Sequence, residues 1–187
     1  MHERDHRLTL LGRVHSALAE AGVPHALIGA AALALYGVSR STYDIDLLAT
    51  EQSCLDQAFW APLSASGAVL EVRKGDLDDP LAGVVRFTEP GERPVDLIVG
   101  KARWQAEALA RAESRIFAAV ELPVLRAPDL ILAKLYAGGP QDAWDIAQLL
   151  AAGDRERLYT EVEQHLGDLP TPAVRLWRRI RVEDPSR

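Results

Sequence analysis

The sequence predicts a mixed α/β (α+β) fold, in which a small mixed sheet with flanking helices precedes a C-terminal helical extension. Over residues 1–126, short apolar runs bounded by Gly, Pro and Asp alternate with amphipathic helical patterns. Residues 127–187 are dominated by helical patterns. We therefore expect a core domain at residues 1–126, with a helical extension at 127–187 packed on it.

Composition limits the classes of protein to consider. The chain has 187 residues, 48% of them hydrophobic, which fits one domain with a small extension. A net charge of −6 argues against bulk binding to nucleic acid but allows a local basic groove. The single Cys54 excludes a disulfide framework. With no apolar run of membrane-spanning length and no signal-peptide pattern, we expect a cytoplasmic protein without membrane contact.

The first predicted elements are a helix, a strand and a second helix. Apolar residues recur every three or four positions over residues 5–21, which predicts an amphipathic helix ending at Gly22. The apolar run at residues 25–28 predicts a buried strand, and His25 within it is expected to be structural or exposed. Small side chains then predict a closely packed helix over residues 30–36.

Gly29 stands at the junction between that strand and that helix. The free N–H groups and positive dipole end of a helix N-terminus attract anions, and a glycine there lets a phosphate approach closely. Because strand-to-helix glycines are common, this signal becomes specific only together with the acidic residues that follow.

Asp44 and Asp46 flank Ile45 at the start of the next apolar run. In a strand, alternate side chains point to one face, so both carboxylates would point to the same side. Neighbouring carboxylates repel each other, and a cation between them removes that repulsion. The pair therefore predicts a divalent-metal site, and the alternative is a solvated strand edge with two exposed acids.

A helix is predicted over residues 51–63. Three strands follow and predict an antiparallel meander: residues 68–72, 83–87 and 95–99. Asp96 is the one acid in the last of these strands. Together with Asp44 and Asp46 it would complete a metal site and offer a general base. The alternative is a lone acid at a strand edge.

Helical patterns dominate the rest of the chain, at residues 104–111, 130–137, 142–150, 156–166 and 173–182. Lys134 and Asp145 lie on two of these helices. One interpretation is that Lys134 lies near bound phosphates and Asp145 orients it, and the other is that they form a structural ion pair. The last helix carries a basic cluster of Arg175, Arg178, Arg179 and Arg181. We expect these side chains to be exposed to solvent, and the alternative is that they contact RNA or phosphates.

These motifs resemble those of the polymerase-β-like nucleotidyltransferase superfamily, and within it the minimal bacterial members that include abortive-infection-type toxins. The resemblance covers residues 27–150 and implies a nucleotidyltransferase fold for the core. It is carried by the following residues: Gly29-Ala30, Arg40-Ser41-Thr42, Asp44-Ile45-Asp46, Asp96, Lys134, Gln141-Asp142 and Asp145-Ile146.

The resemblance implies an enzyme that uses Mg²⁺ or Mn²⁺ to transfer a nucleoside monophosphate from an NTP such as ATP to a hydroxyl group. Asp44, Asp46 and Asp96 would be the metal ligands, and Asp96 would also help to deprotonate the acceptor. The residues expected to bind the nucleotide phosphates are Gly29, Ala30, Arg40, Thr42 and Lys134.

Two departures from the family pattern stand out. The family commonly has Gly-Ser or Gly-Gly where this chain has Gly29-Ala30, which keeps the backbone N–H but lacks a hydroxyl. Gly139 and Gln141 stand where the toxin branch often has basic residues. The acceptor is left open among an RNA end such as tRNA, a protein and a small molecule, and an antitoxin is an expected partner of a toxin. The alternative function is a catalytically impaired nucleotide- or partner-binding module.

Overall fold

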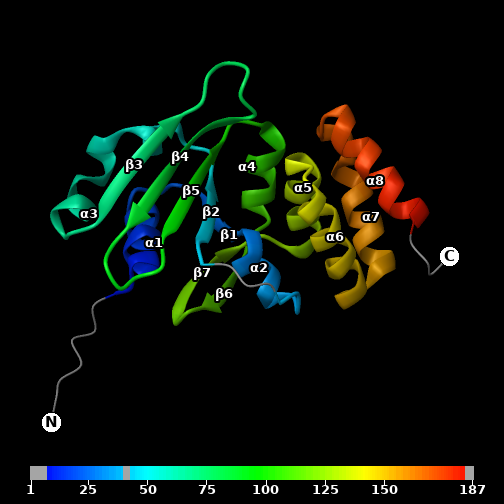
Figure 1. The fold of residues 1–187 in the computed structure, drawn as a ribbon, viewed down its shortest axis with the longest axis horizontal. Helices are drawn as coiled ribbons and strands as arrows, with labels where there is room; N and C mark the ends of the chain where they lie inside the picture. Colours follow the sequence, from blue (N-terminus) through cyan, green and yellow to red (C-terminus); the bar gives the residue numbers. More distant parts are fainter. Residues whose placement is uncertain (1–7, 40–42, 184–187) are drawn as a thin grey trace, which may run out of the picture.

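The computed structural model of the chain describes residues 8–39 and 43–183. The predicted site residues Arg40 and Thr42 lie outside the described residues. Within these ranges the chain forms one mixed sheet with helices on its flanks, which confirms the predicted fold class (Figure 1).

The sheet has seven strands in the described part of the chain, in the order β3-β4-β5-β2-β1-β7-β6. Strands β1 and β2 are antiparallel, whereas β2 pairs with β5 and β1 pairs with β7 in parallel. The strands are β1 (His25–Ile28), β2 (Ile45–Ala49), β3 (Val69–Lys74), β4 (Leu81–Thr88), β5 (Val95–Gly100), β6 (Glu113–Phe117) and β7 (Val120–Val124).

Strands β3, β4 and β5 form the predicted antiparallel meander. Burial alternates along β5, where Val95, Leu97 and Val99 are fully buried in the core and Asp96 faces the opposite side. The meander is joined to the rest of the sheet through the parallel β2–β5 pair. This pairing decides which residues meet at the site described below.

The helices of the core are α1 (Leu10–Glu20), α2 (Gly29–Leu35), α3 (Ala61–Ala65) and α4 (Arg103–Ala110). Thr9 caps α1, because its Oγ1 accepts a hydrogen bond from the Gly12 N–H at 3.2 Å. The apolar stripe of α1 is buried, as its three- and four-residue periodicity predicted.

The helix predicted over residues 51–63 is wrong. The chain instead forms two short 3₁₀ helices, Gln52–Leu55 and Gln57–Trp60, followed by α3. Asp56 adopts an extended conformation between them, and its side chain accepts a hydrogen bond from the Ala58 N–H. An aspartate that bonds to the backbone ahead of it starts a new helical turn and interrupts the previous one.

The C-terminal part is helical, and Figure 1 shows its helices grouped beside α4 on one side of the sheet. The predicted boundary at residue 126 falls between β7 and the first of these helices. They are α5 (Ala127–Ala137), α6 (Pro140–Ala152), α7 (Arg155–His165), the 3₁₀ helix η3 (Leu166–Asp168) and α8 (Thr171–Glu183). No helix among the described residues is long and apolar enough to cross a membrane.

The arginines of the basic cluster on α8 are either exposed to solvent or in contact with α7. Arg175, Arg178 and Arg179 are exposed. Arg181 pairs with Glu163 of α7, and its guanidinium lies 4.8 Å from the centre of the Tyr159 ring. Most of the cluster is therefore a solvated face, the alternative that the sequence favoured.

An ion pair with a buried carboxylate joins α4 to α5. Asp129 lies in the first turn of α5 with only 2% of its side chain exposed, and Arg111 follows the end of α4. The Arg111 Nη2 donates to the Asp129 Oδ1 at 2.6 Å, and Nε donates to the same oxygen at 3.2 Å. Removing the guanidinium would leave a buried carboxylate without its counter-charge.

We expect Arg111→Ala to lower the free energy of unfolding by about 3 kcal/mol in urea titrations at neutral pH. The matched control is Arg103→Ala on the same helix, whose ion pair with Glu107 leaves Arg103 92% exposed. This control should lose less than about 1 kcal/mol. Equal small losses in both variants would show that the Arg111 pair does not hold the two helices together.

Candidate active site

Three aspartates predicted as site residues lie on two neighbouring strands or immediately before one of them. Asp46 of β2 and Asp96 of β5 are direct partners in the parallel pair, and both are half-buried. Side chains at paired positions of a parallel ladder point to the same face of the sheet. Asp44 lies immediately before β2 rather than within the strand, and it is also half-buried.

Arg86 links two of these acids and was not singled out from the sequence. It lies on β4 directly opposite Asp96 in the antiparallel pair. Its Nη1 donates to the Asp96 Oδ2 at 2.8 Å, and its Nη2 donates to the Asp44 Oδ2 at 3.2 Å. The guanidinium therefore supplies positive charge between carboxylates that would otherwise repel each other.

The missed residue had a signal in the sequence. Strands β4 and β5 form a hairpin whose turn contains Gly91, with a positive φ of 84°. Counting outward from Gly91 by equal steps pairs Arg86 with Asp96, as the structure does. A charged residue inside the apolar run of β4, opposite the one acid of β5, was therefore predictable from the turn position.

Asp96 is the acid whose surroundings perturb it most clearly. Burial raises the pKa of Asp96, while the charge of Arg86 acts in the opposite direction and the nearby Asp44 raises it further. Its second oxygen, Oδ1, is buried and has no hydrogen-bond partner among the described residues. A buried carboxylate oxygen in this state is suited to accept a cation or a proton.

Gly29 lies against the carboxylate of Asp46. It is the first residue of α2, has a φ of +63°, and follows Ile28, which pairs with Asp46 across the β1–β2 ladder. A Cβ on Gly29 would lie 2.1 Å from the Asp46 Oδ2. A glycine is thus required both by the backbone conformation and by the Asp46 carboxylate. Phosphate binding by Gly29 and the buried Ala30 stays a prediction.

Lys134 of α5 lies between two acids of α6. Its Nζ is 2.8 Å from the Asp142 Oδ1 and 2.8 Å from the Asp145 Oδ2, and Asp145 is fully buried. Burial alone would lower the pKa of Lys134, but the hydrogen bonds to Asp142 and Asp145 outweigh it and raise that pKa. These contacts describe the structural ion pair between two helices. A role of Lys134 in binding phosphate stays a prediction.

A cavity of about 330 Å³ opens beside Asp46 and Gly29. Its walls come from the site face of the sheet, from α4 and from α5, and Lys134 lies on the α5 side. The lining is mainly apolar: Ile28, Leu48, Leu81, Ile98, Trp104, Leu130, Ala133 and Ala137 are among it. The Trp104 ring lies 5.3 Å from the Tyr136 ring, centre to centre. The cavity could therefore hold a flat or apolar group next to the carboxylates.

The three carboxylates offer a donor set suited to a divalent cation. All are hard oxygen ligands, the preference of Mg²⁺ and Mn²⁺, and Asp96 carries a buried oxygen without a partner among the described residues. In the part of the chain that the structure describes, their oxygens do not form a group within 4.8 Å of one another. Arg86 already lies against two of them, so a cation would have to draw the acids together and displace the guanidinium.

Comparisons with known proteins bear on the architecture. No family model matches the sequence, and no curated protein matches it. Solved structures do match, and the three described here are 15–17% identical to this chain. Antibiotic-resistance factor ANT(2'')-Ia, solved with adenylyl-2''-tobramycin, gives a TM-score of 0.54 at 17% identity, covering 84% of this chain and 95% of its own.

Two further structures agree. An antigenic nucleotidyltransferase-like protein from Paracoccidioides brasiliensis gives a TM-score of 0.51 at 16% identity, covering 89% of this chain and 90% of its own. A candidate nucleotidyltransferase from Thermotoga maritima gives 0.51 at 15% identity, covering 81% of this chain and 100% of its own.

The chain has the nucleotidyltransferase fold. In this fold, Asp46 and Asp96 lie side by side on one face of the sheet, Arg86 links Asp96 to Asp44, and Gly29 lies against Asp46. Lys134 is on the far wall of the neighbouring cavity.

We expect Gly29→Ala to destabilise the protein by about 1–3 kcal/mol more than Gly22→Ala. Both glycines have nearly the same positive φ, +63° and +68°, so both variants carry the same backbone strain. A Cβ on Gly22 meets nothing within 4 Å, whereas one on Gly29 meets the Asp46 carboxylate. Urea unfolding measures the difference, and equal losses would contradict the close approach of Gly29 to Asp46.

Proposed function

We propose that this chain is a metal-dependent nucleotidyltransferase, which moves a nucleoside monophosphate from an NTP to a hydroxyl group of an acceptor. The observation that supports it best is the pairing of Asp46 with Asp96 beside the cavity, with Asp44 joined to Asp96 through Arg86. Carboxylates brought together in this way repel one another, and a bound cation would relieve that repulsion. The match of the fold to nucleotidyltransferases agrees with this proposal.

Asp44, Asp46 and Asp96 would hold the metal, with Mg²⁺ or Mn²⁺ as the suited ions. The bound ions would neutralise charge on the phosphate oxygens and on the leaving pyrophosphate. Gly29, with no side chain, leaves room for the Asp46 carboxylate.

Asp96 would act as the base. The acceptor hydroxyl oxygen bonds to the α-phosphorus, the bond from that phosphorus to the bridging oxygen breaks, and pyrophosphate leaves with the electron pair. The hydroxyl proton passes to Asp96, whose pKa is raised by burial, so that it is a better base than an exposed carboxylate.

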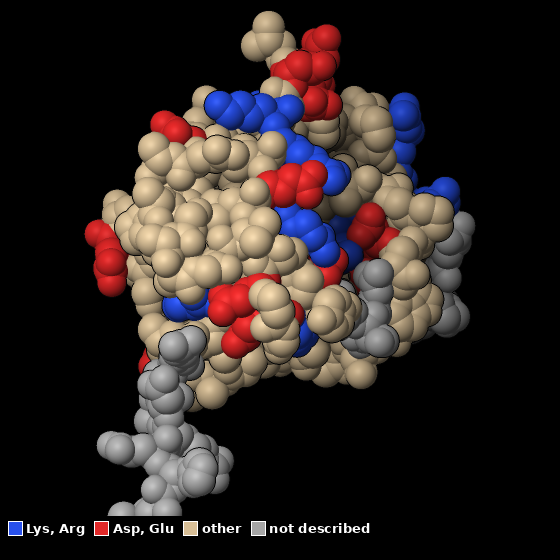
Figure 2. Space-filling model, turned by 60° about the vertical axis from the view of Figure 1, so that its left-hand side comes forward, with Lys and Arg blue, Asp and Glu red and all other residues tan. Residues whose placement is uncertain are grey.

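The phosphates of the NTP would lie near Gly29 and Ala30, with Arg40, Thr42 and Lys134 as further candidates. Among acceptors, the surface favours a small molecule with a hydroxyl over a nucleic acid. Figure 2 shows acidic and basic side chains interleaved along a hollow rather than a broad basic face, and the chain carries a net charge of −6. The mainly apolar walls of the cavity suit a base or an apolar part of the acceptor.

The test is to incubate the protein with each labelled NTP, Mg²⁺ or Mn²⁺, and separate pools of RNA, protein and hydroxylated metabolites. We expect label to move to the metabolite pool, with Asp46→Asn and Asp96→Asn reducing transfer by at least about 100-fold. The control is Asp76→Asn in the exposed turn after β3, which removes a carboxylate of the same size and should retain full activity.

Metal-dependent NTP binding without transfer to any pool would favour the catalytically impaired binding module instead. Label in the RNA or protein pool would keep the reaction but change the acceptor. Absence of both NTP binding and transfer would overturn the proposal. Membership of the toxin branch and an antitoxin partner stay predictions from the sequence.

Arg86 gives a second prediction for the same site. Its guanidinium contacts Asp44 and Asp96, so it competes with a cation for these acids. We expect Arg86→Ala to tighten Mn²⁺ binding, measured by calorimetry without nucleotide, by about tenfold.

The control for this prediction is Arg178→Ala on α8, which removes the same charge. The Arg178 side chain is exposed, and Figure 1 shows α8 at the outer edge of the helical group, away from the strands that carry the aspartates. Its loss should leave the Mn²⁺ affinity within about twofold of that of the wild type. Weaker Mn²⁺ binding in Arg86→Ala would mean that the arginine organises the acids rather than competing for them.

A further inference from the structure

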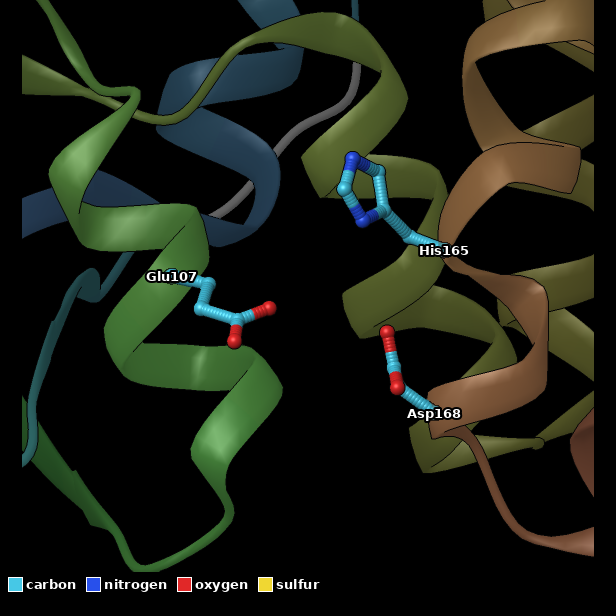
Figure 3. A group of neighbouring side chains, drawn as sticks. All are labelled: Glu107, His165 and Asp168. Atoms are coloured by element: carbon cyan, nitrogen blue, oxygen red, sulfur yellow. The ribbon is translucent and has the colours of Figure 1, made fainter.

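A second group of metal-ligating side chains lies away from the three aspartates. Glu107 comes from α4, His165 is the last residue of α7, and Asp168 ends the short helix η3. One ligand atom of each lies within 4.8 Å of the others. Figure 3 shows the three side chains extending toward one another across the space between α4 and the α7–η3 segment.

The donor types distinguish this group from an ordinary cluster of acids. It combines an imidazole nitrogen with two carboxylate oxygens, a set typical of sites for Zn²⁺ and related transition metals. Mg²⁺ and Ca²⁺ prefer oxygen ligands alone, so they fit it less well.

The spacing is close to that of a metal site. Bonds of about 2.1 Å to Zn²⁺ place neighbouring ligand atoms roughly 3 to 3.5 Å apart. Closing from 4.8 Å therefore needs side-chain rotations that move each atom by on the order of 1 Å. Glu107 and His165 are half-buried while Asp168 is exposed, so two ligands are held by packing and water can complete the coordination.

One interaction competes with the metal. The Arg103 Nε donates to the Glu107 Oε1 at 2.7 Å, one turn earlier on the same helix. Because Arg103 is 92% exposed, this pair contributes little and can give way.

We propose that Glu107, His165 and Asp168 form a binding site for a Zn²⁺-type transition metal, which fastens α4 to the α7–η3 segment. Helix α4 belongs to the core domain and also supplies Trp104 and Gln105 to the wall of the cavity. The two other ligands come from the C-terminal helices. A metal here would brace one wall of the cavity against the helical extension, without taking part in the chemistry at the aspartates.

The test is calorimetric titration of the metal-stripped full chain with Zn²⁺, in a constant large excess of Mg²⁺ that occupies carboxylate-only sites. We expect one equivalent of Zn²⁺ to bind to the wild type. His165→Gln and Glu107→Gln should each weaken that binding by at least about tenfold. Saturating Zn²⁺ should also raise the midpoint of thermal unfolding by about 5 °C or more in the wild type and not in these variants.

Two controls separate this site from other ligands in the chain. His15→Gln removes a different imidazole, one that is hydrogen-bonded to His25 at 2.8 Å, and Glu156→Gln removes an exposed carboxylate on α7. Both should bind Zn²⁺ like the wild type.

Asp168→Asn, at an exposed position, serves as the ligand variant if His165→Gln fails to fold. Unchanged Zn²⁺ affinity in a folded ligand variant, or no stoichiometric binding by the wild type, would overturn the proposal. Because the titration uses no nucleotide, its outcome is independent of the proposed transferase activity.

Discussion

The parallel pairing of β2 with β5 is the constraint on which the site depends. It places Asp46 beside Asp96 on strands that lie about 4.8 Å apart, where two carboxylates repel each other. Two neighbouring residues allow the carboxylates to lie this close together. Arg86 brings a positive charge to Asp96 and Asp44, and Gly29 leaves room for the Asp46 carboxylate because it has no side chain. The charge of Arg86 thus balances the acids, and a divalent cation bound there would take the place of its guanidinium.

Helices α4 and α5 face this side of the sheet across the cavity beside Asp46. They are joined by the ion pair between Arg111 and the buried Asp129. Lys134 is satisfied by Asp142 and Asp145 within the extension, so its charge stabilises the packing of α5 on α6. The cavity therefore combines mainly apolar walls with the carboxylate of Asp46, which suits a ligand that has a flat apolar part and a part able to bind a cation held by the acids.

Most of the secondary structure could be predicted because each element has its own local signal. The three-and-four-residue apolar pattern gave α1, and the apolar runs gave β1 and the meander of β3, β4 and β5. The prediction of a single helix over residues 51–63 was wrong because apolar periodicity takes no account of the Asp56 side chain. That side chain accepts a hydrogen bond from the backbone, so one helical turn ends and another begins. Arg86 was overlooked, although the hairpin turn at Gly91 sets it opposite Asp96.

The sequence by itself determined where most helices and strands form, which of them carry aspartates, and that a glycine separates β1 from α2. Only the tertiary structure decided that β5 lies next to β2, that Arg86 reaches both Asp44 and Asp96, and that Glu107 meets His165 and Asp168. The physical reason is that periodicity depends on neighbours along the chain. The order of strands and the contacts between distant helices depend instead on which apolar surfaces bury one another, and no local pattern specifies that choice.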